Sequence, residues 1–182
     1  MPLGKTFRKL CEEAIEYETA SVCIPPCYIK RVHDTYGEKI NICTVVGFPL
    51  GYSVTEAKAA ETKKALEDGA SEVDMVVNIS DVKNGNYDAV QAEIAALKKI
   101  TGDKILKVII ETCYLTEEEK IAMCKAVTAA GADYIKTSTG FGTAGATLED
   151  IRLFRENIGP DVKMKAAGGV KTVADMEAFL EA

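Results

Sequence analysis

Four charged residues interrupt apolar runs at nearly equal intervals along this sequence. Asp74 lies in E-V-D-M-V-V, Lys107 in I-L-K-V-I-I, Lys136 at the end of Y-I-K, and Lys165 in V-K-M-K-A-A. They are separated by 33, 29 and 29 residues, which is about the length of one strand–helix unit. If each residue holds the same position in a repeated strand, three ammonium groups and one carboxylate meet at one place.

Such a cluster is suited to nucleophilic catalysis by an amine. A buried ammonium beside a second ammonium is disfavoured, so one of the two lysines loses its proton near neutral pH. Lys136 is the candidate Schiff-base nucleophile and Lys165 the candidate neighbouring charge, and small hydroxyl and glycine residues follow Lys136. Asp74 with Lys107 can move protons to and from the adduct. The alternative is that Lys136 is a strand-end lysine whose ammonium reaches water.

Strands and helices alternate in the predicted secondary structure. Strands are predicted over Ala20–Ile24, Lys39–Val46, Glu72–Asn78, Lys104–Glu111, Asp133–Ile135 and Asp161–Ala167. Helices are predicted over Lys5–Tyr17, Cys27–Tyr36, Thr55–Asp68 (N-cap Ser53), Tyr87–Ile100, Thr116–Ala130, Thr147–Asn157 and Thr172–Glu181. Strands that are apolar on both faces indicate a parallel sheet covered by helices. The repeated position of the charged residues favours a TIM (β/α)8-type barrel over a doubly wound sheet.

Glycine-rich loops follow the last two predicted strands. Gly140–Gly145 and Gly168-Gly169 leave backbone N–H groups free beside helix N-termini, which suits an anionic group such as phosphate. With the lysines, they indicate aldol chemistry on a small sugar phosphate. Gly140–Gly145 also matches the dinucleotide motif G-x-G-x-x-G, so a nucleotide-binding oxidoreductase is an alternative. That motif expects an acidic residue at the end of the next strand, and V-K-M-K-A-A-G-G has none.

The composition limits the classes of protein to which this chain can belong. The chain has 182 residues, 47% of them hydrophobic and 27% charged, and we expect one soluble domain over residues 1–182. A formal charge of −6 argues against general nucleic-acid binding. No apolar run is long enough to span a bilayer and no leader is predicted, so we expect a cytoplasmic protein that does not bind membranes.

Cysteine spacing gives no support for a metal site. The six cysteines include no C-x-x-C pair, and His33 is the single histidine. We therefore expect no metal, a surface position for His33, and thiols that mostly act as small buried hydrophobic residues in a reducing compartment.

Several motifs, in order, resemble those of the deoxyribose-phosphate aldolases, which are class I aldolases with a (β/α)8 barrel. They are V-C-I-P-P-C-Y-I, T-V-V-G-F-P-L-G, E-V-D-M-V-V-N, L-K-V-I-I-E-T, Y-I-K-T-S-T-G-F and M-K-A-A-G-G-V-K-T. The resemblance covers about Phe7 to Glu181. It implies an aldehyde-lyase that reversibly cleaves 2-deoxy-D-ribose 5-phosphate to D-glyceraldehyde 3-phosphate and acetaldehyde, without a metal or organic cofactor.

The resemblance also implies roles for individual residues. Lys136 matches the Schiff-base lysine, Lys165 the lysine that perturbs it, and Asp74 with Lys107 the proton relay. The predicted substrate- and phosphate-binding residues are Cys23, Thr137, Gly140, Gly168 and Gly169.

Two strands of that family have no counterpart in the sequence. Only Met1–Gly4 precedes the first helix, where a strand with a D-H-T-like motif is expected, and the chain stops at Ala182 before the last strand and its glycine–serine phosphate loop. We therefore predict a barrel truncated to about six strand–helix units. The alternatives are an active or impaired aldolase and an inactive fragment. Ala20–Ile24 and Asp161–Ala167 would flank a gap with unpaired edges, so we expect a homo-oligomer.

Overall fold

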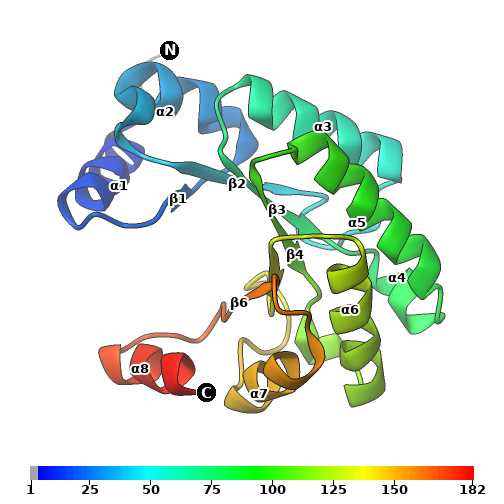
Figure 1. The fold of residues 1–182 in the computed structure, drawn as a ribbon. Helices are drawn as coiled ribbons and strands as arrows, with labels where there is room; N and C mark the ends of the chain where they lie inside the picture. The colour runs from blue at the N-terminus through cyan, green and yellow to red at the C-terminus, as the bar shows by residue number, and fades with distance from the viewer. Residues whose placement is uncertain (1–3) are drawn as a thin grey trace.

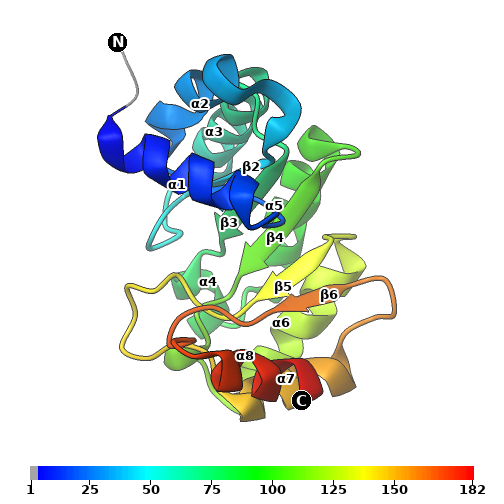
Figure 2. The same ribbon diagram turned by 90° about the vertical axis from the view of Figure 1, so that its left-hand side faces the viewer.

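The computed structural model describes residues 4–182 and contains a six-stranded parallel sheet. The strands are β1 (Val22–Cys23), β2 (Ile42–Val46), β3 (Glu72–Val76), β4 (Ile105–Ile109), β5 (Tyr134–Lys136) and β6 (Lys163–Lys165). They pair in chain order, β1 to β6. Figures 1 and 2 show the sheet curling into an incomplete barrel that is open between β1 and β6.

Helices connect the strands and cover the convex face of the sheet (Figure 1). They are α1 (Lys5–Glu16), α2 (Ile29–Tyr36), α3 (Thr55–Glu67), α4 (Ile79–Lys83), α5 (Tyr87–Thr101), α6 (Glu117–Ala129), α7 (Leu148–Asn157) and α8 (Val173–Glu181), with 3-10 turns at Pro26–Tyr28, Gly37–Lys39 and Thr112–Tyr114. In Figure 2, α1 and α8 lie on opposite sides of the opening. None of the helices in residues 4–182 has the length and apolar content needed to cross a membrane.

The predicted architecture of a truncated TIM-type barrel is confirmed. Each predicted strand and helix has a counterpart, and the strand order follows the chain, whereas a doubly wound sheet reverses its order at a switch point. The predicted absence of a strand at Met1–Gly4 falls mostly on residues outside those described. His33 is exposed, as predicted.

Two local predictions need correction. The N-cap of α3 is Val54, not Ser53, and no side chain caps that end. The sequence analysis also missed α4, which has only five residues and therefore too few turns to show a helical period. Its start is fixed by the Asn78 side chain, which accepts a hydrogen bond from the Ser80 N–H at 3.1 Å.

Along each strand, side chains alternate between the hydrophobic core and the concave face of the sheet. Val73, Met75, Leu106 and Val108 belong to the main hydrophobic cluster, which the strands share with α5, α6 and α7. Successive residues of a strand point to opposite faces, so the residues between them point into the concave face. The burial of the apolar set thus fixes which face of each strand carries charge.

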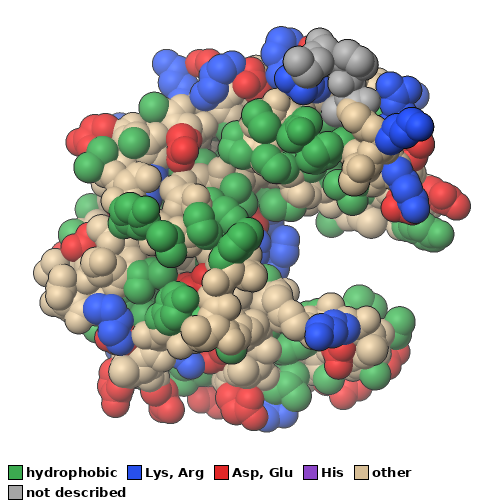
Figure 3. Space-filling view, turned by 180° about the vertical axis from the view of Figure 1, so that it is seen from behind, with side chains coloured by type: hydrophobic (Ala, Val, Ile, Leu, Met, Phe, Trp, Pro, Cys, Tyr) green, Lys and Arg blue, Asp and Glu red, His purple; other side chains and the backbone are tan. Residues whose placement is uncertain are grey.

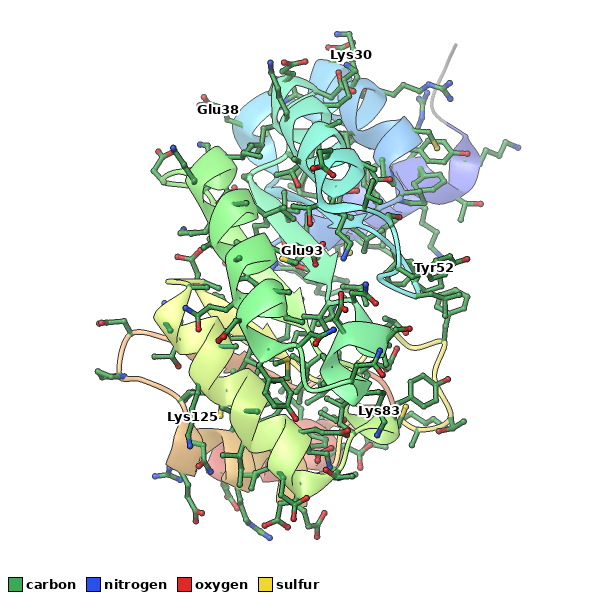
Figure 4. All side chains as sticks on the ribbon, turned by 90° about the vertical axis from the view of Figure 1, so that its right-hand side faces the viewer. Lys30, Glu38, Tyr52, Lys83, Glu93 and Lys125 are labelled. Carbon is green, nitrogen blue, oxygen red and sulfur yellow. The ribbon has the colours of Figure 1, made fainter. Side chains whose placement is uncertain are left out.

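A buried ion pair joins α3 to α5 outside the barrel. Lys58 is fully buried, and its Nζ donates hydrogen bonds to Glu93 Oε2 at 2.7 Å and to the carbonyl oxygen of Val76 at 2.9 Å. Thr55 Oγ1 donates to the other oxygen of Glu93 at 3.1 Å. Glu93 lies among the helices in Figure 4, whereas Lys125 projects outward. The hydrogen bonds of Lys58 therefore link α3 to α5 and to the end of β3.

Lys58→Met is expected to lower the free energy of unfolding by about 3–5 kcal/mol, because it leaves the Glu93 charge buried without a partner. Lys64→Met is the control on the same helix, since Lys64 pairs with Asp68 at the surface, and should cost only about 0–1 kcal/mol. Urea denaturation measures both. If Lys58→Met/Glu93→Leu is as unstable as Lys58→Met, the loss comes from packing and not from the unpaired charge.

Candidate active site

The concave face carries the four predicted charged residues on four consecutive strands. In the strand register, Asp74 of β3 lies opposite Lys107 of β4, and Lys136 of β5 lies opposite Lys165 of β6. Side chains of register partners point to the same face of a sheet. Figure 3 shows that the molecule is deeply hollowed on the side where the sheet is open.

Asp74 is the centre of the cluster and is fully buried. Its Oδ2 accepts a hydrogen bond from Lys136 Nζ at 2.6 Å, and its Oδ1 accepts one from Lys107 Nζ at 2.9 Å. Burial alone raises the pKa of Asp74, but the two ammonium groups outweigh it and hold the pKa below its usual value. Asp74 is therefore a carboxylate at neutral pH, and it bridges two lysines.

Lys107 contacts a second carboxylate that the sequence analysis did not predict. Its Nζ donates to Glu72 Oε2 at 2.5 Å, and Ser21 Oγ donates to the same oxygen at 3.0 Å. Burial lowers the pKa of Lys107, yet Asp74 and Glu72 outweigh it and raise the pKa above its usual value. Lys107 is thus held as an ammonium, which suits a proton donor or an electrostatic partner better than a nucleophile.

Lys136 and Lys165 differ from Lys107 in their partners. Lys136 is 8% exposed and its one carboxylate partner is Asp74, while Lys165 is half-buried and has no ion pair within residues 4–182. Neighbouring strands are about 4.8 Å apart, so Lys165 brings an uncompensated positive charge beside Lys136. The structure therefore brings Asp74, Lys107 and Lys136 into direct contact and places Lys165 next to them.

Cys23 lines a cavity beside this cluster. The cavity has a volume of about 510 Å³ and is lined by Cys23, Ile24, Pro25, Pro26, Val45, Phe48, Glu61 and Phe141. The rings of Phe48 and Phe141 meet edge to face with centroids 5.4 Å apart. The wall beside the charged cluster is therefore largely apolar.

The hydroxyl of Thr137 is engaged in hydrogen bonds to the backbone of a neighbouring strand end. Its Oγ1 donates to the carbonyl oxygen of Ala167 at 3.1 Å and accepts from the Ala167 N–H at 3.0 Å. This pair of bonds fixes the backbone just before Gly168. Thr137 thus positions the second glycine loop, a contact that the strand pairing creates and the sequence does not reveal.

The two glycine loops pack against each other. The Ala146 N–H donates to the carbonyl oxygens of Ala167 at 3.0 Å and Gly168 at 3.1 Å, and a Cβ added to Gly145 would lie 2.4 Å from the Gly168 oxygen. Gly140, Gly168 and Gly169 all have positive φ. Within residues 4–182 their N–H groups have no hydrogen-bond acceptor, so they are free to bind an anion.

Glu111 is another residue that the sequence analysis missed. It is 2% exposed and adopts a left-handed conformation with φ of 53°. Its carboxylate accepts hydrogen bonds from the Thr139 N–H at 3.2 Å and from the Thr139 hydroxyl. Glu111 therefore fixes the start of the loop that carries Gly140. Its place in L-K-V-I-I-E-T, two residues after the end of β4, was the available signal.

Neighbouring strands also create a thiol and carboxylate cluster. Ligand atoms of Cys23, Cys43 and Asp74 lie within 4.8 Å of one another, although their sequence spacing is not that of a metal site. Both Asp74 oxygens already accept hydrogen bonds from ammonium groups. A metal ion at this point would have to displace them.

Removal of the Asp74 charge should change the pH dependence of stability. A carboxyl whose pKa is lowered on folding stabilises the protein above its unfolded pKa, near 3.8, and that contribution disappears as the pH falls through the folded value. The difference in unfolding free energy between the wild type and Asp74→Asn should therefore shrink as the pH falls below about 4. Urea titrations at several pH values measure it, with the exposed Asp161→Asn as control. A difference that grows on acidification would contradict the assignment.

Comparison with known proteins agrees with the fold and identifies the family. The family model described as DeoC/LacD family aldolase matches residues 4–182. A deoxyribose-phosphate aldolase of Clostridium botulinum (strain Alaska E43 / Type E3) is 75% identical over 174 residues, which cover 96% of this chain and 79% of the relative. The corresponding protein of Clostridioides difficile (strain 630) is 62% identical over 173 residues, covering 95% and 79%.

Solved structures give the same result. A putative deoxyribose-phosphate aldolase from Coccidioides immitis has a TM-score of 0.93 at 38% identity, covering 98% of this chain and 72% of that one. The deoxyribose phosphate aldolase from Aeropyrum pernix, described as having a unique tetrameric structure, has a TM-score of 0.87 at 28% identity, covering 95% and 74%. The oxidoreductase alternative is not favoured by any of these similarities. The chain belongs to the DeoC/LacD family of aldolases.

Proposed function

We propose that this chain is a class I aldolase that reversibly cleaves 2-deoxy-D-ribose 5-phosphate to D-glyceraldehyde 3-phosphate and acetaldehyde. The observation that carries the proposal is the contact of Lys136 Nζ with Asp74 at 2.6 Å. Lys107, the other lysine that contacts Asp74, is held as an ammonium by Asp74 and Glu72. The names of the relatives supply the substrate. The inactive-fragment alternative has less support, because all four charged residues of the cluster lie on strands that are present.

The proposed reaction begins at Lys136. Lys136 is an ammonium paired with Asp74 before substrate binds, so it first releases a proton to solvent. The free amine then adds to the substrate carbonyl, and loss of water gives a protonated imine. The protonated imine withdraws electrons from the bond between the α and β carbons of the substrate, so this bond breaks when the hydroxyl on the β carbon loses its proton. The products are D-glyceraldehyde 3-phosphate and an enamine on Lys136. Protonation of the enamine and addition of water release acetaldehyde.

Asp74 and Lys107 are the proposed proton relay in these steps. Asp74 bridges Lys107 and Lys136 through its two oxygens, so a proton taken from the adduct has a short path to return. Lys107 keeps the relay carboxylate ionised between turnovers. Lys165 is the proposed neighbouring positive charge beside Lys136.

Phosphate is proposed to bind at the glycine loops. The N–H groups of Gly140, Gly168 and Gly169 are the donors, and the packing of Gly145 on Gly168 sets their spacing. Cys23 and the cavity beside it are proposed to contact the rest of the substrate. No metal or organic cofactor takes part in this proposal.

Borohydride trapping tests the proposed function directly. Reduction of the wild-type chain with borohydride in the presence of acetaldehyde should fix a two-carbon adduct on Lys136, read by peptide mass mapping. An adduct on Lys107 or Lys165 would overturn the assignment of the nucleophile. If no lysine is modified, the class I mechanism is wrong.

Self-association is a second part of the proposal. Within residues 4–182, β1 and β6 each pair with one strand only, and α8 exposes Val173, Met176 and Leu180 by 67%, 49% and 79%. Exposed apolar faces of this kind mark interfaces. We also propose that the chain acts in the cytoplasm, where free thiols such as its own remain reduced.

Light scattering should give a mass above that of the 19.6 kDa chain, because these surfaces are exposed in a single copy. Leu180→Lys should shift the distribution towards monomer by placing a charge on the apolar face of α8. Glu177→Lys is the control for added charge on the same helix. A monodisperse monomer in the wild type would contradict this part of the proposal.

A further inference from the structure

We propose that Cys23 and Cys43 are a modification site that a hydroperoxide converts reversibly into a disulfide in the wall of the active site. The two residues lie on adjacent strands, β1 and β2, and are direct register partners. The proposal concerns these two thiols and does not depend on the reaction that the site catalyses. Only its effect on turnover rests on the proposed function.

The backbone geometry allows the bond. Adjacent strands are about 4.7–4.9 Å apart, which lies within the Cα separation of about 4.4–6.8 Å found in disulfides. As register partners, both side chains point into the concave face. Their sulfur atoms and an oxygen of Asp74 lie within 4.8 Å of one another. Side-chain rotation therefore suffices to bring the sulfurs together.

The two thiols differ in the way that an attacking and a resolving cysteine differ. Cys23 is exposed, whereas Cys43 is fully buried. A hydrogen bond from Cys43 lowers the pKa of Cys23 to about 7, and Lys136 and Lys165 act in the same direction against burial and Asp74. The interaction with Cys23 and burial together raise the pKa of Cys43. Cys23 is thus the accessible thiolate and Cys43 the thiol that keeps its proton.

The reaction balances with a hydroperoxide as the two-electron oxidant. The Cys23 thiolate attacks the peroxide oxygen, the O–O bond breaks, and sulfenic acid forms with release of hydroxide or alkoxide. Cys43 then attacks the sulfenic sulfur through its own sulfur. The S–O bond breaks, water leaves with the Cys43 proton, and the disulfide forms. A dithiol reductant reverses the oxidation by exchange.

The disulfide would alter the contacts of the charged cluster, because Cys43 lies against Asp74 and Lys107. The Cys43 thiol lies 3.1 Å from Asp74 Oδ1, and Lys107 Nζ donates to its sulfur at 3.4 Å. Asp74 Oδ1 and the Cys23 sulfur are the two acceptors near the one proton of this thiol. Disulfide formation removes this proton and draws the sulfur towards β1, so Asp74 and Lys107 lose a contact. A displacement of about 1 Å at a catalytic group can cost about 100-fold in rate.

Peptide mapping of the full chain after treatment with hydrogen peroxide tests the proposal. Trypsin should release residues 10–30 linked to residues 40–58, with the mass of the two peptides less two hydrogens. Fragmentation at the bonds before Pro25 and Pro26 separates Cys23 from Cys27. A link from Cys27 or Cys11, or overoxidation of Cys23 without any link to Cys43, would overturn the proposal.

Two variants make the test independent of aldolase activity. Cys43→Ser should retain oxidation of Cys23 but convert it to sulfinic acid, which dithiothreitol does not reverse. Cys27→Ser is the matched control, because Cys27 is exposed and lies outside the cluster. It should form the same disulfide as the wild type. Recovery of the free thiols in oxidised Cys43→Ser by dithiothreitol would contradict the role of Cys43.

Turnover provides the functional readout. In the wild type and in Cys27→Ser, turnover should fall by about 100-fold in the oxidised fraction and return with dithiothreitol. If the disulfide forms without change in turnover, the link between Cys43 and Asp74 is wrong. If untreated protein shows no aldolase turnover, the proposed function fails, and the mass readout still decides the disulfide.

Discussion

Lys136→Ala is expected to abolish the borohydride-trapped adduct and to lower turnover by about 10⁴-fold or more, which is within the range measured when a catalytic nucleophile is removed. The reason is that Lys107, which shares Asp74 with Lys136, is held as an ammonium between Asp74 and Glu72. Trapping with acetaldehyde, read by peptide mass, and steady-state cleavage of 2-deoxyribose 5-phosphate measure the two effects.

Controls separate loss of the nucleophile from loss of charge. Lys163→Ala removes an exposed lysine of β6, whose ammonium lies over the Tyr134 ring at 5.7 Å. It should leave trapping intact. Lys165→Ala should keep the adduct on Lys136 but slow its formation at neutral pH, because the neighbouring positive charge is gone. An adduct in Lys136→Ala at the wild-type rate would mean that another lysine forms the imine.

The cluster of four charged residues could be predicted from the sequence because its members recur at a fixed interval in consecutive strands. Asp74, Lys107, Lys136 and Lys165 are charged residues in strands that otherwise bury apolar side chains. Each of the four strands from β3 to β6 contributes one such residue, so a period of about 30 residues sufficed to predict that they converge. Glu72 lies two residues before Asp74 in β3, so alternation places both side chains on the same face of the sheet. The sequence analysis placed Glu72 at the start of the predicted strand Glu72–Asn78 and assigned it no role.

Contacts between residues of different strands could not be predicted from the sequence in the same way. The hydrogen bond of Thr137 to Ala167, the contact of Glu111 with Thr139, and the pairing of Cys23 with Cys43 all depend on register. Register is set by packing of the whole sheet, and no local pattern reports it. The helix α4 was missed for a different reason, since one turn held by an Asn78 cap has no measurable period.

The position of Asp74 between two lysines leads to a second expectation with a large effect. Asp74→Asn should lower turnover by about 10²–10⁴-fold, the usual contribution of general acid–base catalysis. The amide keeps the size of the side chain but cannot take up a proton from the adduct. Imine formation should be affected much less, because the carboxylate forms no covalent bond. The expected result is therefore a variant that is trapped by borohydride and turns over poorly.

Glu72→Gln is the matched comparison for Asp74→Asn. Both substitutions remove one carboxylate from Lys107, but only Asp74 also contacts Lys136. If the main task of these acids is to hold Lys107 as an ammonium, the two variants should lose similar turnover. If Asp74 carries protons to and from the adduct on Lys136, its loss should be the larger by at least tenfold, or about 1.4 kcal/mol in the barrier. Equal losses, with trapping intact in both, would assign Asp74 an electrostatic role and leave the proton relay to another group.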